Sequence, residues 1–197
     1  MGTITRTLAN NITTGGVILP SGINNTSISN VTALPAGVGG KVLQVVSTQL
    51  TTKVDVTVTS ANTWYDASGF SATITPSSAS NKILFSMSLA AASATPGGHR
   101  VYFKILRDST DIGIATSTGS RKATYQYAYN NDGTGVVQYP IMWYDTPSTT
   151  SATTYKLQVT SNSSSQTLRL NAQRDDTDTG DVNRSVTQLI LMEIAGW

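Results

Sequence analysis

The side chains that most often carry out chemistry are scarce in this chain. It has no cysteine, and His99 is its single histidine. A thiolate metal site and a cysteine nucleophile are therefore excluded, and one imidazole cannot complete a two-histidine zinc motif. A Ser–His–Asp relay would depend on the same histidine. We expect no enzyme activity, no metal and no cofactor.

The richest group of carboxylates is the segment Asp175–Asp181, which contains four aspartates. Several carboxylate oxygens in one loop are what Ca²⁺ prefers. The segment lacks the spacing of a helix–loop–helix calcium site, because Gly180 and Asp181 stand at the fifth and sixth positions counted from Asp176, and no glutamate stands at the twelfth. We interpret it as a solvated loop and leave cation binding open.

Aromatic side chains offer a second kind of site. Tyr125, Tyr127 and Tyr129 alternate, so on a strand their rings would share one face. Such rings bind sugars through their faces, and tyrosine is also common in subunit interfaces. These three residues and Trp143 are therefore candidates for a subunit interface or for a glycan platform.

Two Trp-Tyr-Asp triplets, at 64–66 and 143–145, each carry an aspartate that could serve as an acid. Glycoside hydrolysis needs two carboxyl groups at a defined separation, which the sequence does not give. Structural packing is the favoured interpretation of both triplets.

The composition favours strands over helices. Threonine and serine number 31 and 23, charged residues make up 12%, and Glu193 is the one glutamate. Threonine favours strands, whereas glutamate, lysine and arginine usually fill exposed helix faces. The net charge is +2 and the lysines are scattered singly, so we expect no nucleic-acid partner. No apolar run is long enough to predict a membrane span, and we find no secretory signal.

From Lys41 onward the hydrophobic residues repeat with a period of two, as in Val54, Val56 and Val58. The same alternation recurs along the chain between turn-forming clusters, which predicts an all-β, antiparallel β-sandwich of jelly-roll type. Asp108–Asp111 has the spacing of a hairpin loop. The nearly continuous apolar run 186–194 predicts a central strand covered on both faces. The strand candidates are 42–47, 54–58, 72–74, 83–89, 101–105, 112–114, 136–143, 155–159, 168–170 and 186–194.

Residues 1–40 differ from the rest, with one charged residue, Arg6, and no aromatic one. We interpret them as an extended N-terminal arm and linker before a domain at 41–197. Ordering about forty residues costs on the order of 40–80 kcal/mol of backbone entropy, so the arm is either disordered or bound along a partner. Its apolar residues are the candidate partner contacts, and the spacing of the first two also allows a short helix. These contacts are Ile4, Leu8, Val17, Ile18 and Leu19.

Three stretches resemble the opening, middle and closing motifs of a β domain found in virion structural proteins of tailed bacteriophages. They are 40–46 (GKVLQVV), 71–84 (SATITPSSASNKIL) and 191–196 (LMEIAG). The resemblance covers about residues 40–196. It implies a non-enzymatic component of a virus particle, a jelly-roll-like fold and a homotrimer.

The chain lacks the heptads, collagen triplets and β-prism repeats of a fibre shaft. We therefore expect a trimeric capsid decoration, or cement, protein that binds the major capsid protein on the capsid exterior through its arm. The alternative is a tail-fibre or tail-tip adhesin domain that binds host surface glycans.

Overall fold

The computed structural model describes residues 41–93, 95, 99–130 and 135–196, without the side chains of 93 and 128–130. Within these residues the chain is all-β, with every strand pairing antiparallel. The described part contains no helix long and apolar enough to cross a membrane. The strands are β1 (Val42–Leu50), β2 (Val54–Val58), β3 (Tyr65–Ile74), β4 (Lys82–Ser93), β5 (His99–Arg107), β6 (Thr110–Ile112), β7 (Gln126–Asn130), β8 (Val137–Asp145), β9 (Thr153–Ser161), β10 (Gln166–Leu170) and β11 (Thr187–Ile194).

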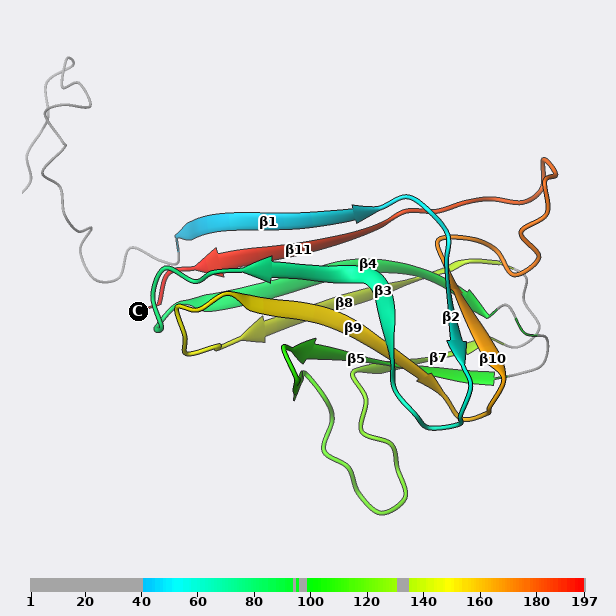
Figure 1. Ribbon diagram of the computed structural model, residues 1–197, viewed down its shortest axis with the longest axis horizontal. Helices are drawn as coiled ribbons and strands as arrows, with labels where there is room; N and C mark the ends of the chain where they lie inside the picture. Colours follow the sequence, from blue (N-terminus) through cyan, green and yellow to red (C-terminus); the bar gives the residue numbers. More distant parts are fainter. Residues whose placement is uncertain (1–40, 94, 96–98, 131–134, 197) are drawn as a thin grey trace, which may run out of the picture. The chain divides into compact units, whose positions relative to one another are not determined.

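The strands form two sheets (Figure 1). In the first, here called sheet A, β4 pairs with β8 along one side and with β11 and then β10 along the other. β1 and β2 continue the sheet beyond β11 and β10. In the second, sheet B, β5 pairs with β9 on one side and with β6 and β7 on the other, and β3 lies beyond β9.

The strand order is that of a jelly roll. Without the short strands β2, β6 and β10, the sheets read β1-β11-β4-β8 and β3-β9-β5-β7. Eight strands divided in this way between two packed sheets define the jelly-roll arrangement. The predicted antiparallel, jelly-roll-like β-sandwich is confirmed.

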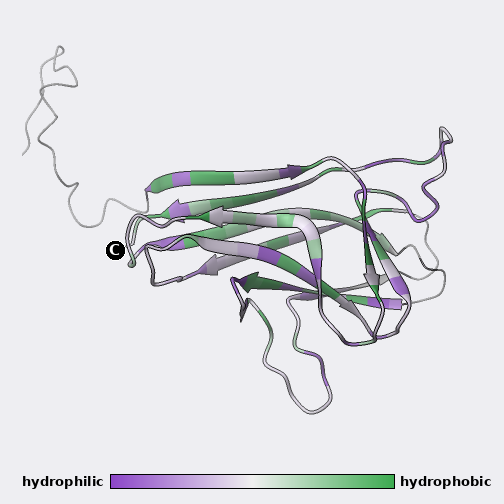
Figure 2. Cartoon of the chain, in the orientation of Figure 1, coloured by the Kyte–Doolittle hydropathy of each residue, from purple (hydrophilic) through white to green (hydrophobic). Residues whose placement is uncertain are grey.

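The core lies between the two sheets and comes from the alternating residues that the sequence predicts. Figure 2 shows the most hydrophobic residues on the strands, while the connecting segments are mostly pale or purple. The buried set includes Val56, Phe85, Phe103 and Leu157, one or more from each of β2, β4, β5 and β9. Only alternate residues of a strand face the core. The residues between them point away from the core and form the outer face of each sheet.

Glu193 connects the three motifs that carry the sequence resemblance. Its carboxylate accepts hydrogen bonds from Gln44 Nε2 (2.6 Å) in the first motif and from Ser77 N (2.7 Å) and Asn81 Nδ2 (2.5 Å) in the second. The side-chain Oδ1 of Asn81 in turn accepts from the Gly196 N–H at 3.0 Å in the third. These hydrogen bonds therefore hold the three motifs together at the end of the sandwich where β1 begins and β11 ends.

Two details of the predicted strands need correction. The hairpin after β5 turns on two residues, Asp108 and Ser109, and Asp108 has a left-handed φ of 53°. β11 lies inside sheet A, between β1 and β4, as predicted, but it is not buried on both faces. Thr187, Leu189, Leu191 and Glu193 are buried, and the residues between them are half-buried or exposed.

Candidate functional site

The outer face of sheet A carries an apolar surface. Residues that pair directly across antiparallel strands lie on the same face, so the register identifies its members. Val45 and Tyr144 stand at the two ends of the central row and are 57% and 45% exposed. The row crosses β1, β11, β4 and β8 through Val45, Met192, Leu84 and Tyr144.

Neighbouring rows extend this surface without adding carboxylates. On one side lies a row in which Met142 is 60% exposed. On the other side Val42 pairs with Ile194, and Ile194 pairs with Lys82. Lys82 is the one charged residue in these rows of described residues, and it lies at their end. The row that contains Met142 is Ser47, Ile190, Ser86 and Met142. The next row on the same side of the central row is Gln49, Gln188, Ser88 and Pro140. We call the four rows together the apolar face.

The apolar face is large enough for a protein–protein contact. Four strands at about 4.8 Å spacing and about eight residues at about 3.3 Å rise give the four rows a footprint of roughly 500 Å² per chain, polar and apolar residues together. Two such footprints together reach the lower limit of a specific interface.

The predicted aromatic candidates do not form one platform. β7 begins at Gln126, and the Tyr125 hydroxyl reaches β8 of the other sheet, where it donates to Met142 O (2.7 Å) and accepts from Met142 N (2.9 Å). Trp143 packs over the backbone of Gly113, so it fastens the start of the β6–β7 segment. Tyr127 is 58% exposed on the outer face of sheet B, and the side chain of Tyr129 lies outside the described residues.

Sheet B has an outer face of opposite character, with a group of aromatic rings and lysines. Lys104 Nζ lies 4.7 Å from the ring centroid of Trp64, and Lys122 Nζ lies 5.8 Å from the same centroid. Lys122 Nζ also lies 5.5 Å from the ring of Tyr102, which is 6.3 Å from the ring of Tyr127. We call these five residues the lysine–aromatic cluster.

The two aspartates considered as acids are both held by hydrogen bonds. Asp145 is buried, and its carboxylate accepts from Arg107 Nη1 at 2.9 Å and from the Tyr155 hydroxyl at 2.7 Å. Asp66 accepts from Lys156 Nζ (2.8 Å) and Gln158 Nε2 (2.6 Å), and the hydrogen bond from Lys156 is the main cause that lowers its pKa. Both arrangements are those of structural carboxylates.

The loop at 175–181 lines a pocket of about 300 Å³. Asp176 in this loop pairs with Lys53 Nζ at 3.0 Å and with Arg184 Nε at 2.6 Å. Its pKa is lowered, first by the hydrogen bond to Lys53. Among the described residues no group of three or more histidine, cysteine or acidic side chains is placed to hold a metal ion.

No protein-family model and no curated protein sequence matches this chain. Two solved structures with weak similarity are from infectious bursal disease virus. The structure of its Gx strain shares 15% identity over 79% of this chain and 41% of that chain, at a TM-score of 0.40. The crystal structure of its VP2 subviral particle shares 12% identity over 78% of this chain and 40% of that chain, at a TM-score of 0.35. The chain thus spans about two fifths of the length of these proteins.

No match supports the tailed-phage resemblance, which stays a prediction. The arm candidates Ile4, Leu8, Val17, Ile18 and Leu19 lie outside the described residues. Sequence reasoning missed the apolar face, although the run 186–194 was its signal: three of the four outward residues of β11, Ile190, Met192 and Ile194, are apolar. It also missed Trp64, Tyr102 and Lys122, which only the fold brings together.

Proposed function

We propose that this protein is a non-enzymatic structural component of a virus particle, a homotrimeric decoration protein on the capsid exterior. The observation that carries the proposal is the apolar face, because its exposed side chains Val45, Met142 and Tyr144 lie together without a carboxylate among the rows, which suits burial in an assembly. The N-terminal arm supplies the contact with the major capsid protein.

The apolar face suits contact with further copies of the same chain. A partner rich in charge would bury charges unpaired against it, whereas a second copy brings a surface whose one charged residue, Lys82, lies at its end. In a closed trimer the β1 side of one copy meets the β8 side of the next around the threefold axis. Val45 and Met142, which mark the two sides, would then face each other between neighbours.

The test is the mass of the assembly in solution. We expect the full chain to sediment as a trimer and the double variant Val45→Lys/Met142→Lys to sediment as a monomer, because each contact would then bury unpaired ammonium groups. Thr57→Lys is the matched control, an exposed strand position in sheet A outside the apolar face. A wild-type monomer at all concentrations, or a double variant that stays trimeric, would contradict the role of this face.

The location on the particle is tested separately. We expect the number of copies per particle to be in the hundreds, as for a shell protein, and a handful of copies would favour the tail-fibre or tail-tip adhesin instead.

A further inference from the structure

The lysine–aromatic cluster has an unbalanced charge. Lys104 pairs with Asp111 at 2.7 Å and Lys156 pairs with Asp66 at 2.8 Å. None of the ion pairs between described residues includes Lys122. Its ammonium group instead lies beside the rings of Trp64 and Tyr102. One positive charge of this surface therefore has no carboxylate partner among the described residues.

The cation is also partly removed from water. Lys122 is half-buried, and this burial lowers the pKa of its ammonium group. An aromatic ring attracts a cation but neutralises no charge. An anion that reached Lys122 Nζ would form a charge-assisted hydrogen bond and recover the lost solvation.

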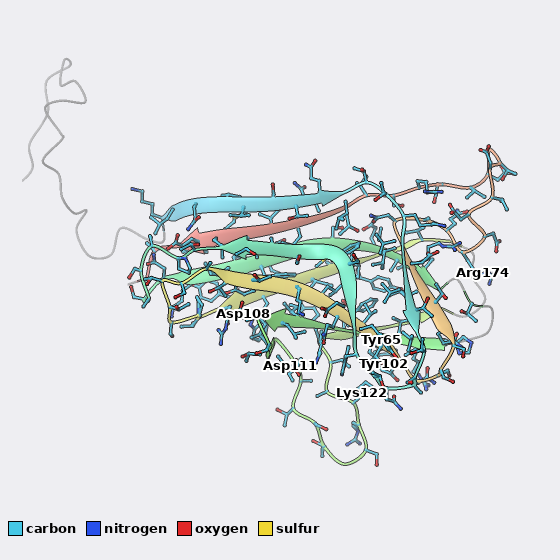
Figure 3. All side chains as sticks on the ribbon, in the orientation of Figure 1. Tyr65, Tyr102, Asp108, Asp111, Lys122 and Arg174 are labelled. Atoms are coloured by element: carbon cyan, nitrogen blue, oxygen red, sulfur yellow. The ribbon has the colours of Figure 1, made fainter. Side chains whose placement is uncertain are left out.

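The surroundings determine what kind of anion fits. The ring of Tyr127 is largely exposed beside Tyr102, which leaves a flat apolar surface next to the charge. Figure 3 labels Tyr102 and Lys122 close together on the sheet B side of the sandwich. The C–H face of a sugar ring stacks on such a surface, while a carboxylate on the same ring can reach the ammonium group.

Other anions fit less well. A nucleic acid needs several phosphate contacts, and here it would meet one unpaired lysine next to Asp66 and Asp111. An acidic peptide would supply the carboxylate but no flat face for the tyrosine ring. Gln158 and Asp66, at 2.6 Å from each other, add donor and acceptor groups beside Lys104, the cross-strand partner of Gln158.

We infer that the lysine–aromatic cluster is a binding site for a carboxylate-bearing sugar, with Lys122 as the anion contact and Tyr127 as the stacking surface. The inference does not depend on the capsid proposal, because it concerns the opposite sheet. It also moves the predicted glycan platform away from Tyr125 and Trp143, which hold backbone segments in place.

The experiment titrates the full chain with a trimer of galacturonic acid and, separately, with a neutral trimer of galactose. Binding is followed by calorimetry and by the intrinsic tryptophan fluorescence, to which Trp64 contributes. We expect millimolar or tighter binding of the acidic trimer and at least tenfold weaker binding of the neutral one. Lys122→Gln should weaken acidic binding about tenfold, the loss of one charge-assisted hydrogen bond, while Lys122→Arg retains it.

Lys82→Gln is the matched control, since it removes one lysine from the other sheet, where its Nζ donates to Thr146. It should leave binding of the acidic trimer unchanged, and circular dichroism should show both glutamine variants folded. The inference is overturned by no binding of the acidic trimer at millimolar concentration, by equal binding of the neutral trimer, or by equal losses in the two glutamine variants. Equal binding of hexa-aspartate would also overturn it and assign the site to an acidic peptide.

Discussion

Glu193 is the residue on which the end of the sandwich depends. It is 1% exposed, and no ion pair between described residues includes it. Burial alone would raise its pKa, but the hydrogen bonds from Asn81, Gln44 and Ser77 outweigh burial and lower the pKa to about 2. A carboxylate is thus kept charged by neutral donors.

The lowered pKa predicts a specific acid sensitivity. The ordinary pKa of 4.5 applies to the unfolded chain, so the stabilisation is fully present above pH 4.5 and is lost as the pH falls through about 2. The difference corresponds to about 3 kcal/mol. We expect Glu193 to contribute about this amount to the fall in the free energy of unfolding, measured in urea, between pH 5 and pH 2.

Replacing the carboxylate tests the same group at neutral pH. Glu193→Gln places a side-chain NH₂ group against the hydrogen-bond donors Gln44, Ser77 and Asn81. It should lower the free energy of unfolding by about 2–3 kcal/mol at pH 7. It should also flatten the dependence between pH 5 and pH 2. Asp181→Asn, an exposed carboxylate, is the control. An unchanged acid profile in Glu193→Gln would show that another group governs the transition.

Gly196 is needed for a close approach rather than for its backbone freedom. A Cβ atom at this position would lie 2.3 Å from the carbonyl oxygen of Ser80, which belongs to the backbone. Gly196→Ala should therefore lower the free energy of unfolding by about 1–3 kcal/mol in thermal or urea denaturation. Gly180→Ala, where a Cβ would meet nothing within 4 Å, should leave stability within about 0.5 kcal/mol of the wild type.

At the scale of the elements, a group of three side chains, of which Asp145 and Tyr155 are buried and Arg107 is half-buried, connects the two sheets. Arg107 on β5 and Tyr155 on β9 both donate to Asp145 on β8, so sheet B is bonded to the edge of sheet A. Burial and then the bond to Asp145 raise the pKa of Tyr155 well above its usual value.

The variant Tyr155→Phe tests this tie. It removes the hydroxyl that donates to Asp145, while the Asp145 carboxylate stays buried. We expect the free energy of unfolding to fall by about 2 kcal/mol. Tyr144→Phe is the matched control, because that ring is exposed on the neighbouring residue of β8. A similar loss in both variants would mean that the hydroxyl of Tyr155 is not what matters.

The elements were largely predictable because a period of two is a local property of the sequence. Val54–Val58 and Tyr155–Val159 each fall within a strand that was expected from it. The Glu193 hydrogen bonds were not predictable, because Gln44, Ser77 and Glu193 are brought together only by the pairing of distant strands. Lys122 lies on a connecting segment, where no periodicity indicates which way a side chain faces.

At the scale of the whole molecule, the two outer faces differ, and this difference separates the proposed roles.

Deletion of residues 1–20 should leave a folded β domain with unchanged thermal stability, since the deleted residues precede every described strand. In a sedimentation assay with undecorated particles, we expect the truncated chain to remain in the supernatant. Binding at wild-type strength would mean that the arm is not the tether.

The segment between β6 and β7 runs out from the body of the sandwich (Figure 1). The Ala115 N–H donates to Thr124 O at 3.1 Å, which closes the base of this segment, and a Cβ at Gly119 would meet nothing within 4 Å. A foreign peptide inserted after Gly119 would therefore disturb neither sheet. If the protein coats a particle through its arm, the same insertion point would display an antigen or an enzyme tag in a regular array.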